Sequence, residues 1–308
     1  MSITLLRIFG IPFRVNYTWL VIFGLVITSL ALYQLPDSNP TWSTAEYWLI
    51  ATITTFLFFT SVVLHELSHA IFALRHGLPV RSITLFIFGG VAHIAREAER
   101  PRAEAFIALA GPVSSLLIAG AFYLLYQFVG PHNEQVGAIS AWLAVVNVAL
   151  AAFNMVPGFP MDGGRVLRSV IWAISGDYRK ATRISTWVGR SVAYLMILGG
   201  AILLFTGDWA SGVWLMFIGL FIDNAAMANY KHTMLRETLR ERLIGDFMAP
   251  IPAAAAYSTG APMVEITDNA NRVMEEMEEK GIREALVVRG GVVVGVVRKD
   301  TLGKWKGS

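Results

Sequence analysis

The chain has 308 residues, of which 55% are hydrophobic and only 15% are charged. Soluble domains usually carry about 25% charged residues, so this composition excludes a disordered chain and a typical cytosolic enzyme. The net charge of +3 is too small and too dispersed to indicate a nucleic-acid partner, and none is expected. Because the chain contains no cysteine, a metal ion would have to be bound by His, Asp or Glu.

Six stretches are apolar enough to cross a bilayer, which takes about 20 helical residues. They are residues 15–36, 47–74, 105–131, 135–161, 191–207 and 209–230. The connections after the first, third and fifth stretches contain no Lys or Arg, whereas the alternate connections are basic. The positive-inside rule therefore predicts a polytopic helical protein of the cell membrane, embedded in the lipid bilayer, with both termini in the cytoplasm.

Two segments depart from simple membrane spans. Residues 82–92 are apolar but too short to cross, and their β-branched and aromatic residues together with Gly89 and Gly90 predict a re-entrant strand or hairpin. The prolines and glycine of residues 157–160 predict a break in the fourth span before Asp162. Non-helical backbone at this depth is stable only when it is buried in protein or lines a wet cavity.

The composition becomes more polar after residue 230. The predicted divisions are a membrane domain at residues 1–230, a charged linker helix at 231–245 and a small cytosolic α/β domain at 246–308. In the last of these, Asp268 is expected to cap a helix. Residues 284–288 and 292–297 are expected to form paired strands.

The most informative motif is HELSH at residues 65–69. His65 and His69 would share one face of a helix, where both can bind one Zn²⁺ while Glu66 acts as a general base towards the activated water. The pattern also occurs by chance in soluble helices, but here it lies within a span, about 15 Å from Arg75 at about 1.5 Å per residue. Three polar groups at this depth would cost several kcal/mol unless they were paired, coordinated or hydrated, which favours a metal site.

A hydrolytic zinc site uses three protein ligands and leaves one position open. The third ligand is expected from another span, where the deepest carboxylates are Asp162 and Asp223. Asp162 follows the broken helix and can turn back towards the core, whereas Asp223 can simply face the bundle near the interface. We therefore expect one Zn²⁺ per chain, bound by His65, His69 and Asp162, with Asp223 as the weaker alternative.

Three stretches of the sequence resemble the site-2 protease family of intramembrane zinc metalloproteases. They are HELSH at 65–69, FGGVA at 88–92 and NMVPGFPMDGG at 154–164. The Asn-x-x-Pro-x4-Asp-Gly pattern is more specific than H-E-x-x-H, and the step Ala110-Gly-Pro112 also resembles the family. The resemblance covers roughly residues 5–230.

The resemblance implies an enzyme that hydrolyses peptide bonds within or near transmembrane segments of membrane-protein substrates, as in regulated intramembrane proteolysis. It also implies that His65, His69 and Asp162 bind zinc and that Glu66 is the catalytic base. The residue corresponding to Asn154 would position the substrate or stabilise the oxyanion. A helix-end cap or an interhelical hydrogen bond is the alternative role for this asparagine.

A helical substrate must be unwound before cleavage, because its carbonyls are hydrogen-bonded and crowded. An exposed strand edge within residues 82–92 could bind the extended chain through backbone pairing, and Gly89 and Gly90 would allow close approach. The alternative is a purely structural hairpin that closes the cytosolic opening of the membrane domain.

The tail resembles one CBS motif, through GDFMAP at 245–250 and GVVRKD at 295–300. Such motifs usually occur in pairs and often bind adenosine nucleotides. The family's aspartate is present as Asp300, but Val297 stands where the family has Ser or Thr, which weakens the prediction of an adenine nucleotide. A single motif leaves apolar faces exposed, so a homodimer through this domain is expected unless a second motif is missing.

Two other functions fit parts of this sequence. One is a CBS-regulated ion channel or transporter that uses the cluster His65, Glu66, His69 and Asp162 as a permeation site. The other is a catalytically inactive chaperone of membrane segments. The enzyme is favoured because a channel does not need a glutamate between two histidines, a third ligand and an open coordination position.

Overall fold

The computed structural model describes residues 2–8, 10–87, 89–240, 242–249 and 261–304. Its contacts divide the chain into two compact units, Met1–Asp223 and Asn224–Ser308. The boundary falls inside the last long helix, and the residues from 231 continue that helix to Arg240. The predicted limits of the membrane domain, the linker and the tail domain otherwise stay predictions.

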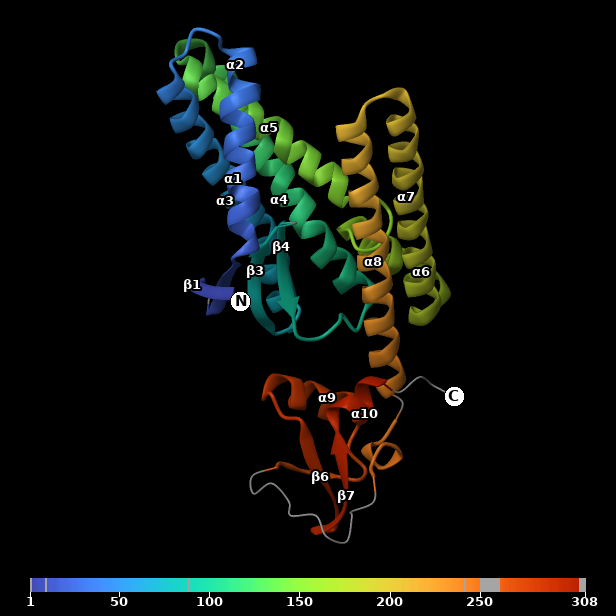
Figure 1. The fold of residues 1–308 in the computed structure, drawn as a ribbon. Helices are drawn as coiled ribbons and strands as arrows, with labels where there is room; N and C mark the ends of the chain where they lie inside the picture. Colours follow the sequence, from blue (N-terminus) through green and yellow to red (C-terminus); the bar gives the residue numbers. More distant parts are fainter. Residues whose placement is uncertain (1, 9, 88, 241, 250–260, 305–308) are drawn as a thin grey trace. The chain divides into compact units, whose positions relative to one another are not determined.

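Six helical segments of the described chain are long and apolar enough to cross a membrane, which confirms the predicted number of spans (Figure 1). The first comprises α1 (Thr18–Ser29), a π-helical segment (Leu30–Gln34) and α2 (Leu35–Ser38). The others are α3 (Thr44–Arg75), α4 (Pro101–Phe128), α5 (Glu134–Asn154), α7 (Tyr178–Thr206) and α8 (Trp209–Arg240). The chain is therefore a multi-pass membrane protein.

A capping box determines where α3 begins. The Ser43 hydroxyl accepts a hydrogen bond from the Glu46 N–H at 3.3 Å, and Glu46 Oε2 accepts one from the Ser43 N–H at 2.7 Å. These bonds satisfy N–H groups that the first helical turn would otherwise leave without partners. Because α3 continues from there to Arg75, its phase decides which side chains face the bundle.

Four strands of unit 1 form one sheet in the order β1-β2-β3-β4. They are β1 (Ser2–Ile8), β2 (Ile11–Asn16), β3 (Val80–Phe86) and β4 (Gly89–Ile94). β3 and β4 form an antiparallel hairpin where the sequence predicted a strand or hairpin, and β2 pairs with β3 in parallel. Residue 88 of this segment lies outside the described residues, and entry of the hairpin into the membrane stays a prediction. β1 and β2 were not predicted.

An apolar cluster joins this sheet to α3. Its buried members are Ile11, Phe13, Val62, Leu67, Ala70, Ile83 and Leu85. They come from β2, β3 and the turns of α3 that carry the HELSH motif. Burial of these side chains therefore fixes the hairpin against the motif.

α5 ends at Asn154, and α6 (Asp162–Ser175) begins after a non-helical segment, which confirms the predicted break. α6 itself was not predicted. The non-helical segment packs closely on α7. The Phe159 N–H donates to the Ser185 carbonyl at 3.2 Å, and a Cβ added at Gly189 would lie only 2.8 Å from the Phe159 nitrogen. These contacts hold the chain that leads into α6.

A buried ion pair ties α6 to α4. Arg168 Nε donates to Glu104 Oε1 at 2.7 Å, and the guanidinium also lies 4.8 Å from the ring centroids of Phe159 and Tyr178. Burial acts to lower the pKa of Arg168, but Glu104, Tyr178 and Glu97 hold that pKa above its usual value. The guanidinium therefore stays charged. Removing one partner of such a pair is costly, so the pair fixes the position of α6 on α4.

Unit 2 contains a three-stranded sheet in the order β5-β6-β7. Its elements are β5 (Met263–Glu265), α9 (Ala270–Glu279), β6 (Glu284–Arg289), β7 (Val292–Arg298) and α10 (Lys299–Lys304). β6 and β7 pair antiparallel, which confirms the predicted strand pairing.

The cap of α9 differs from the prediction by one residue. Asn269 Oδ1 accepts from the N–H groups of Asn271 and Arg272, whereas Asp268 Oδ2 accepts from the Glu265 N–H. The neighbouring polar residue therefore caps the helix, because it stands one position closer to the first turn. The resemblance to a CBS motif, of which residue 250 lies outside the described residues, stays a prediction.

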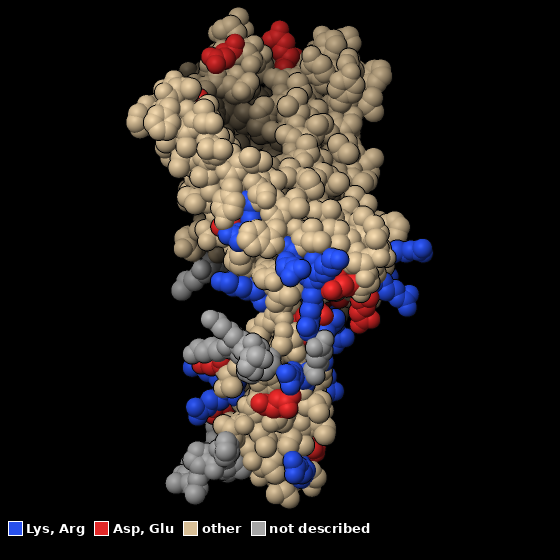
Figure 2. Space-filling model, turned by 90° about the vertical axis from the view of Figure 1, so that its right-hand side faces the viewer, with Lys and Arg blue, Asp and Glu red and all other residues tan. Residues whose placement is uncertain are grey.

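Charge is distributed unevenly over unit 1. On the face shown in Figure 2, the charged residues at one end of the membrane unit are all acidic. Lys and Arg lie towards the other end of this unit. The acidic end includes the Arg- and Lys-free connections 37–46 and 130–134. This asymmetry agrees with the positive-inside argument, and the orientation itself stays a prediction.

Candidate metal centre

α3 places two imidazoles on one face, one helical turn apart. His65 and His69 are 3% and 4% exposed, and their Nε2 atoms lie 3.2 Å from each other. The spacing of four residues produces this arrangement, because positions i and i+4 are neighbours on an α-helix. Both Nε2 atoms thus point at the same small volume.

The first residue of α6 brings a carboxylate to the same volume. Asp162 Oδ2 lies 3.0 Å from His69 Nε2 and 3.3 Å from His65 Nε2, and the three donor atoms all lie within 4.8 Å of one another. The Asp162 side chain is 12% exposed, so its carboxylate is largely withdrawn from the surroundings of the protein.

Asp223, the weaker candidate for the third ligand, lies elsewhere. Its Oδ1 accepts a hydrogen bond from Arg190 Nε at 2.7 Å, in an ion pair between α7 and α8. Among the described residues, the group that could hold a metal ion contains Asp162 and not Asp223. The pairing explains why a carboxylate is tolerated in this last span.

One face of α4 orients the two imidazoles. The Ser115 hydroxyl lies 2.9 Å from His65 Nδ1, and the Ile107 carbonyl oxygen lies 2.7 Å from His69 Nδ1. Neither partner was predicted from the sequence. They stand eight residues apart, so a helical face with this spacing is the signal that could have revealed them.

Gly111 lies between these two partners on the same face of α4. A Cβ added there would lie 2.6 Å from His65 Nε2 and closer still to His69 Nε2, so a larger residue would overlap the imidazoles. In the sequence, this glycine stood out only as part of a family resemblance. Its physical role is to let the α4 backbone approach the donor atoms.

The donor set suits a cation. A carbonyl oxygen can only accept, so His69 Nδ1 must carry its proton towards Ile107, which leaves the Nε2 lone pair free in the neutral ring. Lone pairs from two imidazoles and an ionised carboxylate would repel one another without a positive charge between them. Two histidines and one aspartate are ligands that zinc accepts, and three protein ligands leave a position open.

The Glu66 carboxylate is held beside this cluster by the edge strand β4. Glu66 Oε2 accepts a hydrogen bond from the Ala92 N–H at 3.1 Å. A Cβ added at Gly90 would lie 2.5 Å from Glu66 Cγ, so this glycine lets β4 pack directly on the glutamate. The hairpin therefore positions the carboxylate.

A cavity of about 330 Å³ opens onto the cluster. The residues singled out from the sequence that line it are His65, Glu66, Gly89, Gly90 and Asn154. Apolar side chains such as Phe58, Val62 and Leu150 form most of the remaining wall. The space is therefore mostly apolar, with its polar groups gathered near the imidazoles.

Two predicted site residues, Asn154 and Asp300, lie outside the group of metal-binding side chains. Asn154 Nδ2 donates to the Leu150 carbonyl at 3.0 Å, so in this structure the amide nitrogen bonds to its own helix. Asp300 stands in the first turn of α10 in unit 2. It is not among the residues that form the metal centre of unit 1.

Comparisons with known proteins all indicate the same family of peptidases. The family model described as peptidase family M50 matches residues 53–138 and 131–198. The protein sll0528 of Synechocystis sp. is 37% identical over 244 residues, which cover 79% of this chain and 63% of that protein. The zinc metalloprotease MJ0392 of Methanocaldococcus jannaschii is 30% identical over 251 residues, which cover 82% of this chain and 67% of that protein.

A solved structure is also similar. The site-2 protease from Methanocaldococcus jannaschii matches with a TM-score of 0.51 and 26% sequence identity, over 84% of this chain and 100% of that chain. The present chain spans somewhat less than two thirds of the length of the first relatives it matches, at 63% and 65%.

Proposed function

Because the chain belongs to peptidase family M50, the family of the site-2 proteases, we propose that it is a zinc metalloprotease that hydrolyses peptide bonds of membrane-protein substrates inside the bilayer. The observation that carries this proposal is the convergence of His65 Nε2, His69 Nε2 and Asp162 Oδ2 beside Glu66. The comparisons give no support to the alternative of an ion channel or transporter.

His65, His69 and Asp162 would hold one zinc ion. When bound, zinc supplies a Lewis acid that polarises a peptide carbonyl and makes a nearby water more acidic. The bonds from Ser115 and Ile107 keep the two imidazoles in the orientation that presents Nε2, and such partners also raise ligand basicity.

Glu66 would act as the general base and acid. Its carboxylate takes a proton from the water that attacks the scissile carbonyl carbon. As the new C–O bond forms and the C–N bond breaks, the same carboxyl returns that proton to the leaving amine nitrogen. The hydrogen bond from the Ala92 N–H holds one carboxylate oxygen, which limits the rotation of the side chain.

Asn154 is proposed to contact the substrate. Its amide lines the cavity next to Glu66, and a rotation away from the Leu150 carbonyl would let it donate to the developing oxyanion. The observed bond to Leu150 supports equally the helix-end role that the sequence left open.

The edge of β4 is proposed to bind the unwound substrate. β4 is the last described strand of its sheet, and its residues Gly89 and Gly90 line the cavity. An extended peptide added at this edge would lie next to Glu66, and main-chain hydrogen bonds would supply the affinity.

Cross-linking tests this binding mode. The chain contains no cysteine, so Val91→Cys provides a single thiol on an exposed strand residue. Cysteine is placed in turn at successive positions of a single-pass model substrate. We expect disulfides to form at every second position, because neighbouring residues of an extended strand face opposite sides. A thiol at Leu25, which is exposed on α1, serves as the control. A repeat of three to four positions would mean that the substrate binds as a helix and would contradict the proposal.

Metal removal tests the enzymatic proposal. Purified full-length protein is expected to contain one zinc ion per chain by inductively coupled plasma mass spectrometry. A chelator should remove the ion and stop cleavage of a membrane-protein substrate, and added zinc should restore both. Asp162→Asn should lower zinc content and Asp223→Asn should leave it unchanged, because only Asp162 lies with the imidazoles. Cleavage by metal-free protein would refute the proposal.

Three further proposals rest on the sequence arguments alone. They are the cytoplasmic position of both termini, dimerisation through residues 246–308 and binding of an adenine nucleotide at Asp300. No experiment on the metal centre bears on them.

A further inference from the structure

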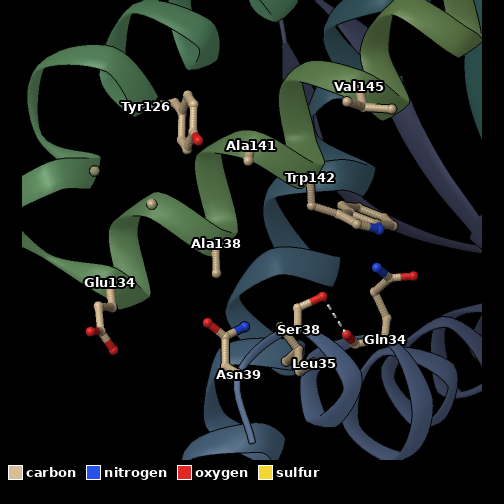
Figure 3. Close-up of a pocket in the computed structure, with 12 residues that line it drawn as sticks. Gln34, Leu35, Ser38, Asn39, Tyr126, Glu134, Ala138, Ala141, Trp142 and Val145 are labelled. Atoms are coloured by element: carbon tan, nitrogen blue, oxygen red, sulfur yellow. Dashed lines mark hydrogen bonds between the residues drawn. The ribbon is translucent and has the colours of Figure 1, made fainter.

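A second cavity lies near the C-terminal end of α4 and the N-terminal half of α5, and Figure 3 shows its lining residues. It has a volume of about 590 Å³ and lies among the end of the π-helical segment, α2, the end of α4 and the first half of α5. Tyr126, which lines it, is eleven residues beyond Ser115 on α4, or about 16 Å along the helix at about 1.5 Å per residue. The cavity is therefore separate from the proposed catalytic site.

A few polar side chains form part of the lining of this cavity, among them Gln34, Asn39 and Glu134. Within the described chain, neither the Gln34 nor the Asn39 side-chain amide has a hydrogen-bond partner, although both line the space. Glu134 Oε2 accepts only a long bond of 3.4 Å from Trp42 Nε1. These groups could bind a ligand with both donors and acceptors.

An apolar groove continues from the cavity. Val145 lines both the cavity and a groove of about 420 Å³ between α4 and α5. The buried side chains of Ala119 and Ala144 form part of the groove wall, and larger exposed side chains, among them Tyr123, also line it. The cavity, which has a few polar side chains in its lining, thus adjoins an apolar groove, as a lipid head group adjoins its hydrocarbon chain.

The charge of the cavity indicates the kind of head group. Glu134 is the single charged residue among the described residues that line it. The neighbouring connections 37–46 and 130–134 contain acidic residues and no Lys or Arg. An anionic head group would be repelled here, whereas an ammonium group would be attracted.

The lining of the groove suits a hydrocarbon chain. It is apolar apart from the Tyr123 hydroxyl, and the small residues Ala119, Gly120 and Ala144 form part of it. A single acyl chain can therefore lie against this surface.

We propose that this cavity and groove together bind one phospholipid with a primary ammonium head group, such as phosphatidylethanolamine. The ammonium pairs with Glu134, and the amide N–H groups of Gln34 and Asn39 donate to phosphate or ester oxygens. One acyl chain lies along the groove over Ala119 and Ala144. The lipid joins the α1–α2 segment to α5 at the end of the bundle that is remote from the zinc ligands.

Native mass spectrometry of delipidated full-length protein tests this site. With phosphatidylethanolamine, phosphatidylcholine and phosphatidylglycerol supplied separately, we expect one retained lipid per chain and the strongest retention for phosphatidylethanolamine. Its advantage should be about tenfold, the ratio that one charge-assisted hydrogen bond provides. Glu134→Gln should abolish the advantage over phosphatidylcholine, while the zinc content of the variant stays at one per chain.

A second variant keeps the test independent of Glu134. An added Cβ at Gly120 meets no atom within 4 Å, so Gly120→Leu should fill the groove without disturbing the fold and should weaken retention of every lipid. Gly24→Leu is the matched control, because the space at Gly24 is equally open but lies outside the groove. Equal retention of the three lipids by the native chain, or a preference for phosphatidylglycerol, would overturn the proposal. A photo-reactive group can also be placed at Val145. Labelling of polypeptide instead of lipid by this group would overturn the proposal.

Discussion

Replacement of Glu66 by Gln is expected to slow cleavage of a membrane-protein substrate by about 10²- to 10⁴-fold, the range for loss of a positioned general acid–base. The amide has nearly the same shape as the carboxylate, so it can still accept the hydrogen bond from the Ala92 N–H. It cannot take up a proton from the attacking water. The zinc content of Glu66→Gln should stay at one ion per chain, because the proposed ligands are His65, His69 and Asp162.

The measurement is initial-rate cleavage in detergent or liposomes, combined with metal analysis of the same preparation. Glu99→Gln is a suitable control, since Glu99 is an exposed glutamate outside the cavity at the metal centre. Cleavage by Glu66→Gln at the native rate would show that another group moves the proton. Loss of zinc from this variant would show that Glu66 belongs to the metal ligands.

Replacement of Gly111 by Ala should weaken zinc binding and lower activity together. The added methyl group would lie 2.6 Å from His65 Nε2 and closer to His69 Nε2, well inside van der Waals contact. α4 must then move away or the imidazoles must turn, and both changes break the bonds to Ser115 and Ile107. We expect zinc affinity to fall by about tenfold to hundredfold, since removal of the groups that hydrogen-bond to metal ligands has about this effect.

Gly120→Ala is the matched control on the same helix, where an added Cβ meets no atom within 4 Å. It should leave zinc content, cleavage and the circular dichroism spectrum at native values. Gly111→Ala should keep the helical spectrum, because alanine favours a helix. Native zinc affinity in Gly111→Ala would contradict the close packing of α4 on the imidazoles.

The local patterns of the sequence were sufficient for much of the membrane unit. Long apolar runs predicted the six spans, and residues 157–160 predicted the break before α6, because these features act on the chain within a few residues. Asp162 was singled out as the partner of His65 and His69 by its charge and depth. Ninety-three residues separate it from His69, and the structure brings the two within 3.0 Å.

The elements that were missed depend on distant parts of the chain. β2 is short and contains Pro12, and only its parallel pairing with β3 joins β1 and β2 to the distant hairpin. α6 carries charged and glycine residues, so no apolar run marks it, and its position depends on the pair of Arg168 with Glu104 on α4.

The amino-acid sequence alone determined which chemical groups this protein can use: two imidazoles one helical turn apart, a glutamate between them and a carboxylate after a broken helix. Spacing and apolarity are local properties, so they need no knowledge of the fold. Only the tertiary structure decided that the Ile107–Ser115 face of α4 orients the imidazoles, that β4 holds Glu66 and that the cavity near Glu134 adjoins an apolar groove between α4 and α5. Each of these contacts joins segments distant in sequence, and the packing of side chains that brings them together is a property of the whole bundle.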